Sequence, residues 1–292
     1  MKQVTIIGLG LIGTSLGLAL KQLKNPPKVV GNDVQYDAAT RASRLKAVDR
    51  AERNLQEAVS GADLVVVATP VSVIPDVLRA AVPALSSGCV ITDTGSTKRE
   101  VVRLAREILP SSLSFVGGHP MTGKATGGVD EPSASLFQSA IYCLTPVAFT
   151  PEPSVAAVAS MVQQIGASAF FLDPIEHDGL VAGISHLPYL LSATLMRVLA
   201  SETAWREMSD LAAGGFEMTT RLAGRDPKMY ADILGTNSDN MVRYLDRLMA
   251  ELSVMRERLV SGQSSVEPAL KEAQDKRLEW EENRRRAQQA QQ

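Results

Sequence analysis

Histidine is the residue type best suited to acid-base chemistry near neutral pH, and this chain of 292 residues contains three of them. His119 stands in the motif GGHPMTG, directly after an apolar run that is typical of a buried strand. A histidine between a glycine pair and a proline lies on a fixed turn, and ligands of parallel sheets bind where strands end. We therefore predict that His119 is a general base at this edge of the fold.

The other two histidines lie further along the chain, and we expect different roles for them. For His177, which precedes Asp178, we favour a structural or capping role. His186 lies deep in apolar sequence, where a charged imidazole would be costly, so it should be neutral and hydrogen-bonded. Its partner could be a substrate or another part of the protein.

Arg221 follows small residues in the motif GGFEMTTRLA, which let a ligand approach closely. An arginine among threonine, leucine and alanine side chains needs a partner. Two parallel hydrogen bonds to a ligand carboxylate would satisfy its guanidinium, and a buried ion pair with a protein acid is the alternative.

Ser96 belongs to a second polar motif, DTGSTK, which also follows an apolar strand. The simplest interpretation is an N-cap, with Ser96 or Thr97 starting the helix that contains Val101 and Val102. A hydroxyl at a helix N-terminus could also bond to a substrate oxygen and to the catalytic histidine.

The motif GLGLIG near the N-terminus follows a predicted strand and opens a helix, which is the context of a dinucleotide site. Gly8 would permit the tight turn, Gly10 would let the backbone approach a pyrophosphate, and Gly13 would let the helix pack closely on the strand. The first helical residues, Leu11 and Ile12, would offer backbone N–H groups to the phosphates.

Asp33 ends the second predicted strand and favours NAD, because it can accept both ribose hydroxyls and would repel the 2′-phosphate of NADP. Arg41 and Arg44 on the following helix could neutralise that phosphate, so NADP stays possible. Thr69 and Pro70, at the end of the third strand, should pass near the cofactor.

The elements that must position these residues alternate between strand and helix through the first 170 residues. The strands read as continuous valine and isoleucine runs, which is typical of a parallel sheet covered by helices on both faces. The predicted strands are residues 4–7, 28–31, 64–68, 90–92, 114–116 and 169–172. Beyond residue 173 the pattern is helical, with a long amphipathic helix over 237–260.

The predicted fold class is therefore α/β, with an N-terminal Rossmann dinucleotide-binding domain followed by an all-helical C-terminal domain. We place the Rossmann domain at 1–173, a helical substrate domain at 174–260, and a charged tail at 261–292. In the tail, a linker at 262–265 should precede a solvated helix with acid-base pairs four residues apart. These pairs are Glu272 with Lys276, Glu281 with Arg285, and Glu282 with Arg286.

Composition excludes several other classes of protein. With 30 basic against 32 acidic side chains, the chain lacks the positive surface that nucleic acid requires. Cys89 and Cys143 lie in apolar runs and are expected to be reduced, as in a cytoplasmic protein, and no metal-ligand spacing is present. The uncharged segment 179–196 has the minimum length of a membrane span, but its histidine, proline and hydroxyls favour a buried domain helix.

Together these motifs resemble the prephenate and arogenate dehydrogenases of tyrosine biosynthesis. The resemblance extends over residues 4–260 through GLGLIG, DTGSTK, GGHPMTG, HDGLVAGISHLP and GGFEMTTRLAGRDPKMY, in the order of that family. It implies a homodimer that binds a small cyclohexadienyl acid and oxidatively decarboxylates it with NAD. In that family a histidine takes the proton of the ring hydroxyl, a serine bonds to both groups, and an arginine grips a substrate carboxylate; the matching residues are His119, Ser96 and Arg221.

Three positions depart from the pattern of prephenate-specific members and leave the choice between prephenate and arogenate open. Tyr189 stands where those members carry a second histidine, which places it with His186 in the substrate site. Lys124 and Ala125 replace an acid after HPMTG, and Met218 replaces another acid.

Two further function classes remain as alternatives. A β-hydroxyacid dehydrogenase shares the architecture but uses a lysine on the interdomain helix, and residues 175–200 contain none. A non-catalytic nucleotide sensor would require none of the three matched residues.

Overall fold

The computed structural model describes residues 1–122 and 131–289. Its sheet has eight strands in the order β3-β2-β1-β4-β5-β6-β7-β8, and all neighbours are parallel except β6 and β7. The strands are β1 Gln3–Ile7, β2 Lys28–Asn32, β3 Arg50–Ala51, β4 Leu64–Val67, β5 Val90–Asp93, β6 Ser114–Pro120, β7 Ile141–Thr145 and β8 Ser168–Phe171. The order reverses beside β1, so the carboxyl ends of β1 and β4 flank the crevice where such sheets bind nucleotides.

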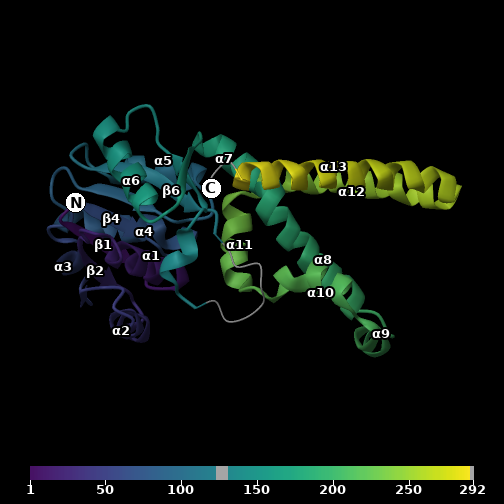
Figure 1. Ribbon diagram of the computed structural model, residues 1–292, viewed down its shortest axis with the longest axis horizontal. Coiled ribbons are helices and arrows are strands. Elements are labelled where there is room, and N and C mark those ends of the chain that lie inside the picture. The colour runs from purple at the N-terminus through teal and green to yellow at the C-terminus, as the bar shows by residue number, and fades with distance from the viewer. Residues whose placement is uncertain (123–130, 290–292) are drawn as a thin grey trace. The chain divides into compact units, whose positions relative to one another are not determined.

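Helices cover both faces of this sheet, as Figure 1 shows. The covering helices are α1 Leu11–Lys21, α2 Tyr36–Arg44, α3 Leu55–Val59, α4 Ile74–Ala81, α5 Arg99–Ile108 and α6 Glu152–Gln164. Ile6 packs into a core with α1 and α6, whereas its neighbour Ile7 packs into a second core with α4 and α5. Successive strand residues point to opposite faces, so a buried parallel strand must be apolar at every position.

The six predicted strands are confirmed, and two strands were missed. β3 has only two residues, both exposed, and carries little apolar signal. β7 lies between β6 and β8 and runs antiparallel to β6. An apolar run does not reveal the direction of a strand, and we assigned no element to this one.

The chain after residue 173 is helical, as predicted. Its elements are α7 Pro174–Val181, a π-helical turn Ala182–His186, α8 Leu187–Ala200, α9 Trp205–Leu211, α10 Gly214–Thr220, a 3₁₀ turn Arg221–Gly224, α11 Pro227–Thr236, α12 Ser238–Ser261 and α13 Gln263–Gln289. Asp173 starts α7 by accepting from the backbone N–H groups of Ile175 and Glu176.

The helix from Pro174 to Ala200 is the one described helix that is long and apolar enough to cross a membrane. Only 28% of its most apolar window is buried within the described chain. We expected segment 179–196 to be a buried helix, and this prediction is wrong for one chain by itself. Its exposed large apolar side chains are Ile175, Leu180, Ile184, Leu191 and Val198.

The described contacts divide the chain into a compact unit of residues 1–241 and a second unit of residues 242–292. The helices up to α11 thus pack in one unit with the sheet, and the division into 1–173, 174–260 and 261–292 stays a prediction. The linker expected at 262–265 is wrong, because Gly262 alone separates α12 from α13, with a φ of +105°. In α13, Glu282 pairs with Arg286 as predicted, whereas Glu281 pairs with Arg277 at 2.8 Å.

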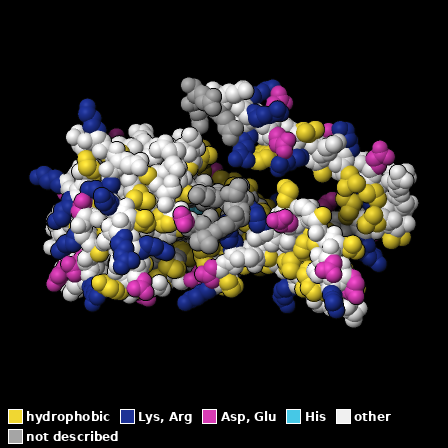
Figure 2. Space-filling view, turned by 60° about the horizontal axis from the view of Figure 1, so that its bottom comes forward, with side chains coloured by type: hydrophobic (Ala, Val, Ile, Leu, Met, Phe, Trp, Pro, Cys, Tyr) yellow, Lys and Arg dark blue, Asp and Glu magenta, His cyan; other side chains and the backbone are white. Residues whose placement is uncertain are grey.

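Acidic and basic side chains are interspersed on the face of the protein drawn in Figure 2. On this face no broad area of one charge is visible, in agreement with the nearly balanced composition.

Candidate functional site

The glycine turn between β1 and α1 has the backbone geometry that a dinucleotide site needs. Gly8 has a φ of +93°, and a Cβ there would lie 2.5 Å from the carbonyl oxygen of Ala68. A Cβ on Gly13 would lie 1.9 Å from the carbonyl oxygen of Gly8, so only glycine lets α1 approach β1 this closely. At Gly10 a Cβ would meet nothing within 4 Å, which leaves open space beside the backbone.

The predicted cofactor residues gather around this turn. Asp33 accepts from the backbone N–H of Leu9 at 2.6 Å and from that of Gln35 at 2.7 Å, which fixes its carboxylate beside the turn. Thr69 adjoins Gly8, since a Cβ on that glycine would lie 3.1 Å from its methyl group. Pro70 follows at the end of β4.

The first turn of α1 has no side-chain cap. Gly10 is its N-cap residue, and Leu11 and Ile12 begin the helix with partly buried side chains. The first N–H groups of a helix have no partner within the helix, so this end can receive phosphate oxygens.

His119 lies near the end of β6, with 9% of its surface exposed. Its Nδ1 lies 2.9 Å from Nε2 of His177, and its Nε2 has no hydrogen-bond partner among the described residues. Burial is the main cause that lowers the pKa of His119 well below its usual value of 6.5. The neighbouring His177 and Lys98 lower that pKa further, followed by His186, so the imidazole is neutral at physiological pH.

The sequence did not reveal that His177 contacts the predicted base. His177 is fully buried, and its Nδ1 lies 2.8 Å from Oδ1 of Asp178. The one available signal was the dipeptide His-Asp in the first turn of α7, which we interpreted as structural. No hydrogen bond joins Ser96 to His119 among the described residues, although Ser96 is partly buried on the loop before α5.

The N-cap predicted for α5 is wrong. The helix begins at Arg99, and the Asp178 carboxylate accepts from the backbone N–H groups of Lys98 at 2.7 Å and Arg99 at 2.9 Å. Thr97 instead pairs its hydroxyl with that of Thr236 on α11, 2.9 Å away. The carboxylate of Asp178, from a distant part of the chain, thus caps α5 in place of the hydroxyl of Ser96 or Thr97.

A buried ion pair between Lys98 and Asp93 lies next to the backbone that precedes His119. Both side chains are fully buried, and the Lys98 ammonium also donates to the carbonyl oxygen of Gly118 at 2.7 Å. The Asp93 carboxylate accepts from the N–H of Gly118 at 3.0 Å. The pair thus fixes the backbone next to His119, a role that sequence reasoning did not assign to Lys98.

His186 presents an unpaired nitrogen in a buried position. Its Nδ1 lies 3.3 Å from the amide nitrogen of Asn237, which donates, so the proton of the neutral ring is on Nε2. Nε2 is buried with no partner among the described residues. Burial lowers the pKa of His186 to about 4, which agrees with the expected neutral ring and leaves an N–H donor for a ligand.

Tyr189 and Arg221 lie in one neighbourhood through Tyr230. The rings of Tyr189 and Tyr230 are stacked, with centroids 3.5 Å apart and planes 2° apart. Arg221 is close enough to Tyr230 to lower the pKa of that phenol, against burial, which raises it most. The alternative partner for Arg221, a protein acid, is not found within the described part of the chain.

The other positions that depart from the pattern of prephenate-specific members are Met218, Lys124 and Ala125. Met218 is 79% exposed, and Lys124 and Ala125 lie outside the described residues.

Comparison with known families gives two adjoining matches. The model of the prephenate dehydrogenase nucleotide-binding domain matches residues 16–171, more than half of the chain, and that of the prephenate dehydrogenase dimerization domain matches residues 173–272. This chain belongs to the prephenate dehydrogenase family. Membership confirms the resemblance drawn from the motifs and the predicted fold class, and it removes the β-hydroxyacid dehydrogenase alternative.

Individual members of the prephenate dehydrogenase family align over most of the chain. A prephenate dehydrogenase of Bacillus subtilis is 35% identical over 255 residues, which are 87% of this chain and 69% of that protein. A cyclohexadienyl dehydrogenase of Zymomonas mobilis is 33% identical over 262 residues, 89% of each chain. The structure of an A. aeolicus prephenate dehydrogenase with hydroxyphenyl propionate and NAD+ superposes with a TM-score of 0.88 at 27% identity, over 96% of this chain and 98% of that one.

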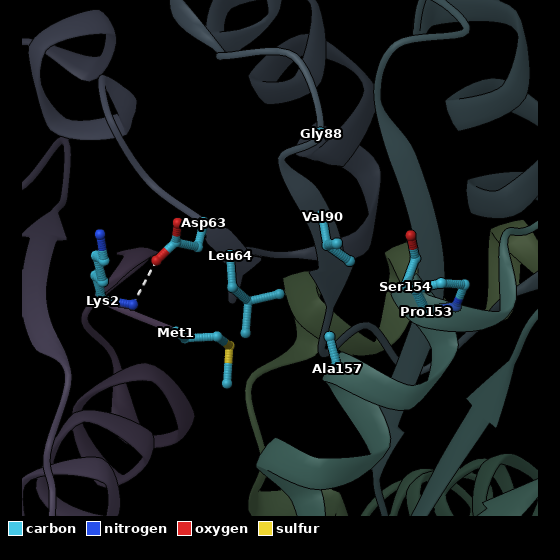
Figure 3. A pocket seen from close by; sticks show the side chains of 9 residues that line it. All are labelled: Met1, Lys2, Asp63, Leu64, Gly88, Val90, Pro153, Ser154 and Ala157. Carbon is cyan, nitrogen blue, oxygen red and sulfur yellow. Dashed lines mark hydrogen bonds between the residues drawn. The ribbon is translucent and has the colours of Figure 1, made fainter.

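One hollow among the described residues lies away from this site. It has a volume of about 510 Å³ and lies where β4 and β5 begin, between Met1, Asp63, Gly88 and Ser154 (Figure 3). The Asp63 carboxylate is occupied there by the backbone N–H groups of Lys2 and Gln3. His119 lies instead at the carboxyl end of β6, the end at which parallel sheets bind their ligands. The described residues contain no cluster that could hold a metal ion.

We predict that Gly13→Ala and Gly10→Ala affect different properties. The methyl group of Gly13→Ala must displace the backbone of Gly8, which should lower the free energy of unfolding by about 1–3 kcal/mol and weaken NAD binding. Gly10→Ala meets no protein atom, so it should weaken NAD binding with little loss of stability. Thermal unfolding and fluorescence titration with NAD measure both effects, and equal stability of the two variants would contradict the prediction.

Proposed function

We propose that this chain oxidatively decarboxylates prephenate to 4-hydroxyphenylpyruvate with NAD, as part of tyrosine biosynthesis. The observation that carries the proposal is the neutral, buried His119, whose Nε2 has no partner among the described residues, in a member of this family. Arogenate, which would give tyrosine, is the alternative substrate, because the Zymomonas relative is a cyclohexadienyl dehydrogenase.

His119 acts as the general base in this proposal. Its Nε2 removes the proton of the ring hydroxyl while the C4–H bond breaks, and the ring carboxylate then leaves as CO₂. NAD, when bound, supplies the hydride acceptor. Loss of CO₂ makes the ring aromatic, so the reaction is effectively irreversible.

Substrate recognition falls to polar groups that the described protein leaves unpaired. In this proposal the Ser96 hydroxyl bonds to the substrate hydroxyl, and Arg221 holds a substrate carboxylate with two hydrogen bonds. The Nε2–H of His186 offers a further donor. Tyr189, fixed by its stack on Tyr230, takes the place of the second histidine of prephenate-specific members and bears on substrate choice.

The residues around the glycine turn fit NAD. The open space at Gly10 and the uncapped start of α1 at Leu11 and Ile12 would receive the pyrophosphate, flanked by Thr69 and Pro70. The Asp33 carboxylate would accept the ribose hydroxyls. NADP is the alternative cofactor, supported by Arg41 and Arg44, which are exposed on α2.

We further propose that the chain forms a homodimer and acts in the cytoplasm. The matched dimerization domain contains the exposed apolar residues of α7 and α8, which a second copy would cover. Cys89 and Cys143 are both free and buried, as suits a reducing compartment.

The experiment that tests the proposed function compares prephenate and arogenate as substrates, each with NAD and with NADP, in steady state. We expect prephenate with NAD to give the highest kcat/KM of the four combinations. Absence of turnover in all four would refute the proposal, and a higher value for arogenate would favour the alternative.

His119→Asn should abolish most of the turnover, because the asparagine amide cannot accept the hydroxyl proton. We expect kcat to fall by about 10²- to 10⁴-fold, the usual contribution of a general base. NAD affinity should stay within about twofold, because β4 and β5 separate β6, which contains His119, from β1 and its glycine turn. Fluorescence titration checks this. Full turnover in this variant would exclude His119 as the base.

The pH dependence follows from the lowered pKa of His119. A base acts only when neutral, so kcat/KM should rise with pH through that pKa and then level off. Because burial, His177 and Lys98 hold the pKa well below 6.5, the rise should lie below pH 6.5 and the profile should be flat from there to about pH 8. A midpoint above pH 6.5 would contradict the lowered pKa or the assignment of the rise to His119.

Arg221→Gln should raise the KM for the substrate by about 10- to 100-fold, the value of charge-assisted hydrogen bonds to a carboxylate. The KM for NAD should not change. Arg79→Gln on α4 is the matched control, since it removes an exposed arginine that pairs with Asp76. If KM responds equally in both variants, the carboxylate is held elsewhere.

A further inference from the structure

His119 is joined to the first turn of α5 by a continuous line of buried polar groups. His119 Nδ1 lies 2.9 Å from His177 Nε2, His177 Nδ1 lies 2.8 Å from Asp178 Oδ1, and the Asp178 carboxylate accepts from Lys98 and Arg99. Building on the proposed function, we propose that His177 and Asp178 are positioning residues that hold His119 in the one neutral tautomer able to act as a base.

The donors at the start of α5 determine the direction of each hydrogen bond along the line. The backbone N–H groups of Lys98 and Arg99 can only donate, so the Asp178 carboxylate is the acceptor at the start of α5. A carboxylate that accepts there also accepts from His177, which places the His177 proton on Nδ1.

The same logic continues to the base. When His177 carries a single proton, on Nδ1, its Nε2 is unprotonated and can only accept. His119 must then donate from Nδ1, and its own Nε2 carries the lone pair. That nitrogen is the one without a partner among the described residues, so its lone pair is free to accept the proton of the substrate.

Burial makes this arrangement specific. His177 is 0% exposed and Asp178 is 1% exposed, so water cannot replace either partner. The rings of His119 and His177 meet edge-on, with planes 70° apart and centroids 5.1 Å apart. A hydrogen bond in such surroundings fixes ring orientation more firmly than one that competes with solvent.

The line also stabilises His119 after it has taken a proton. Besides His177, the ionisable groups that act on the pKa of His119 are Lys98, which is paired with Asp93, and His186, which is neutral. Lys98 disfavours a second positive charge there. The Asp178 carboxylate, acting through His177, offsets that effect. This is the role that a buried carboxylate has behind the histidine of a serine protease triad.

Tautomers can be read directly, because the chain contains only three histidines. In the full-length protein labelled with ¹⁵N-histidine, imidazole ¹⁵N shifts at pH 8 should show His119 protonated at Nδ1 and unprotonated at Nε2, with peaks assigned through the variants below. A proton on Nε2 of His119 would overturn the proposal. The measurement needs no substrate, so its result does not depend on the proposed function.

Two substitutions of His177 separate positioning from packing. His177→Gln keeps an amide oxygen that can accept from His119 Nδ1, whereas His177→Phe keeps a ring without an acceptor. We expect kcat to fall by about 10²-fold or more in the phenylalanine variant and by less than about 10-fold in the glutamine variant, with the KM for NAD unchanged in both. The ¹⁵N spectrum should keep the Nδ1–H tautomer of His119 in the glutamine variant alone.

Thermal unfolding of both variants serves as the control for folding. Equal losses of kcat in the two variants, or an unchanged kcat in the phenylalanine variant, would overturn the proposal. If the wild-type protein turned over neither prephenate nor arogenate while its His119 showed the expected tautomer, the proposed function alone would fail.

Discussion

The N-terminus of α5 requires an acceptor, and the structure supplies it from another part of the chain. A helix start leaves backbone N–H groups unpaired, and leaving them so in a buried position is costly. Asp178 of α7 satisfies two of these groups, at Lys98 and Arg99, and its own carbonyl oxygen accepts from Asn237 before α12. One residue thus ties the sheet domain to the helices that follow it, and it does so beside the proposed base.

The ion pair of Lys98 and Asp93 depends on the same local order. Removing one partner of a fully buried pair typically costs about 3–5 kcal/mol, because the other charge is left uncompensated. The pair binds both the N–H and the carbonyl oxygen of Gly118, so the backbone that precedes His119 has little freedom. A general base needs such rigid support, because its lone pair must point at the proton that it removes.

The sequence predicted the parts of the fold that depend on local pattern. Buried parallel strands such as β4 must be apolar at every position, and Gly13 is forced by a contact within its own turn, to the carbonyl oxygen of Gly8, so both features can be recognised without a structure. Gly8 also meets the carbonyl oxygen of Ala68, a contact that the local pattern does not show. β7 was not assigned, although Cys143 lies in its apolar run, and such a run would not have shown that the strand is antiparallel to β6. The position of His119 at the end of a buried strand could be predicted from its own motif. Its bond to His177 spans 58 residues and the cap from Asp178 spans 80, and only packing brings these residues together. The same packing explains why Ser96 and Thr97 do not cap α5.

The π-helical turn Ala182–His186 sets the rotation of everything on α8 relative to α7. Such a turn contains one residue more than a regular α-helical turn, and each residue of a helix accounts for a rotation of about 100°. Loss of a single residue here would keep a continuous helix, yet it would swing Tyr189 and Ser192 away from the partners that they now face. The length of this segment is therefore fixed as strictly as its composition, and homologous chains should accept substitutions within it far more readily than a deletion.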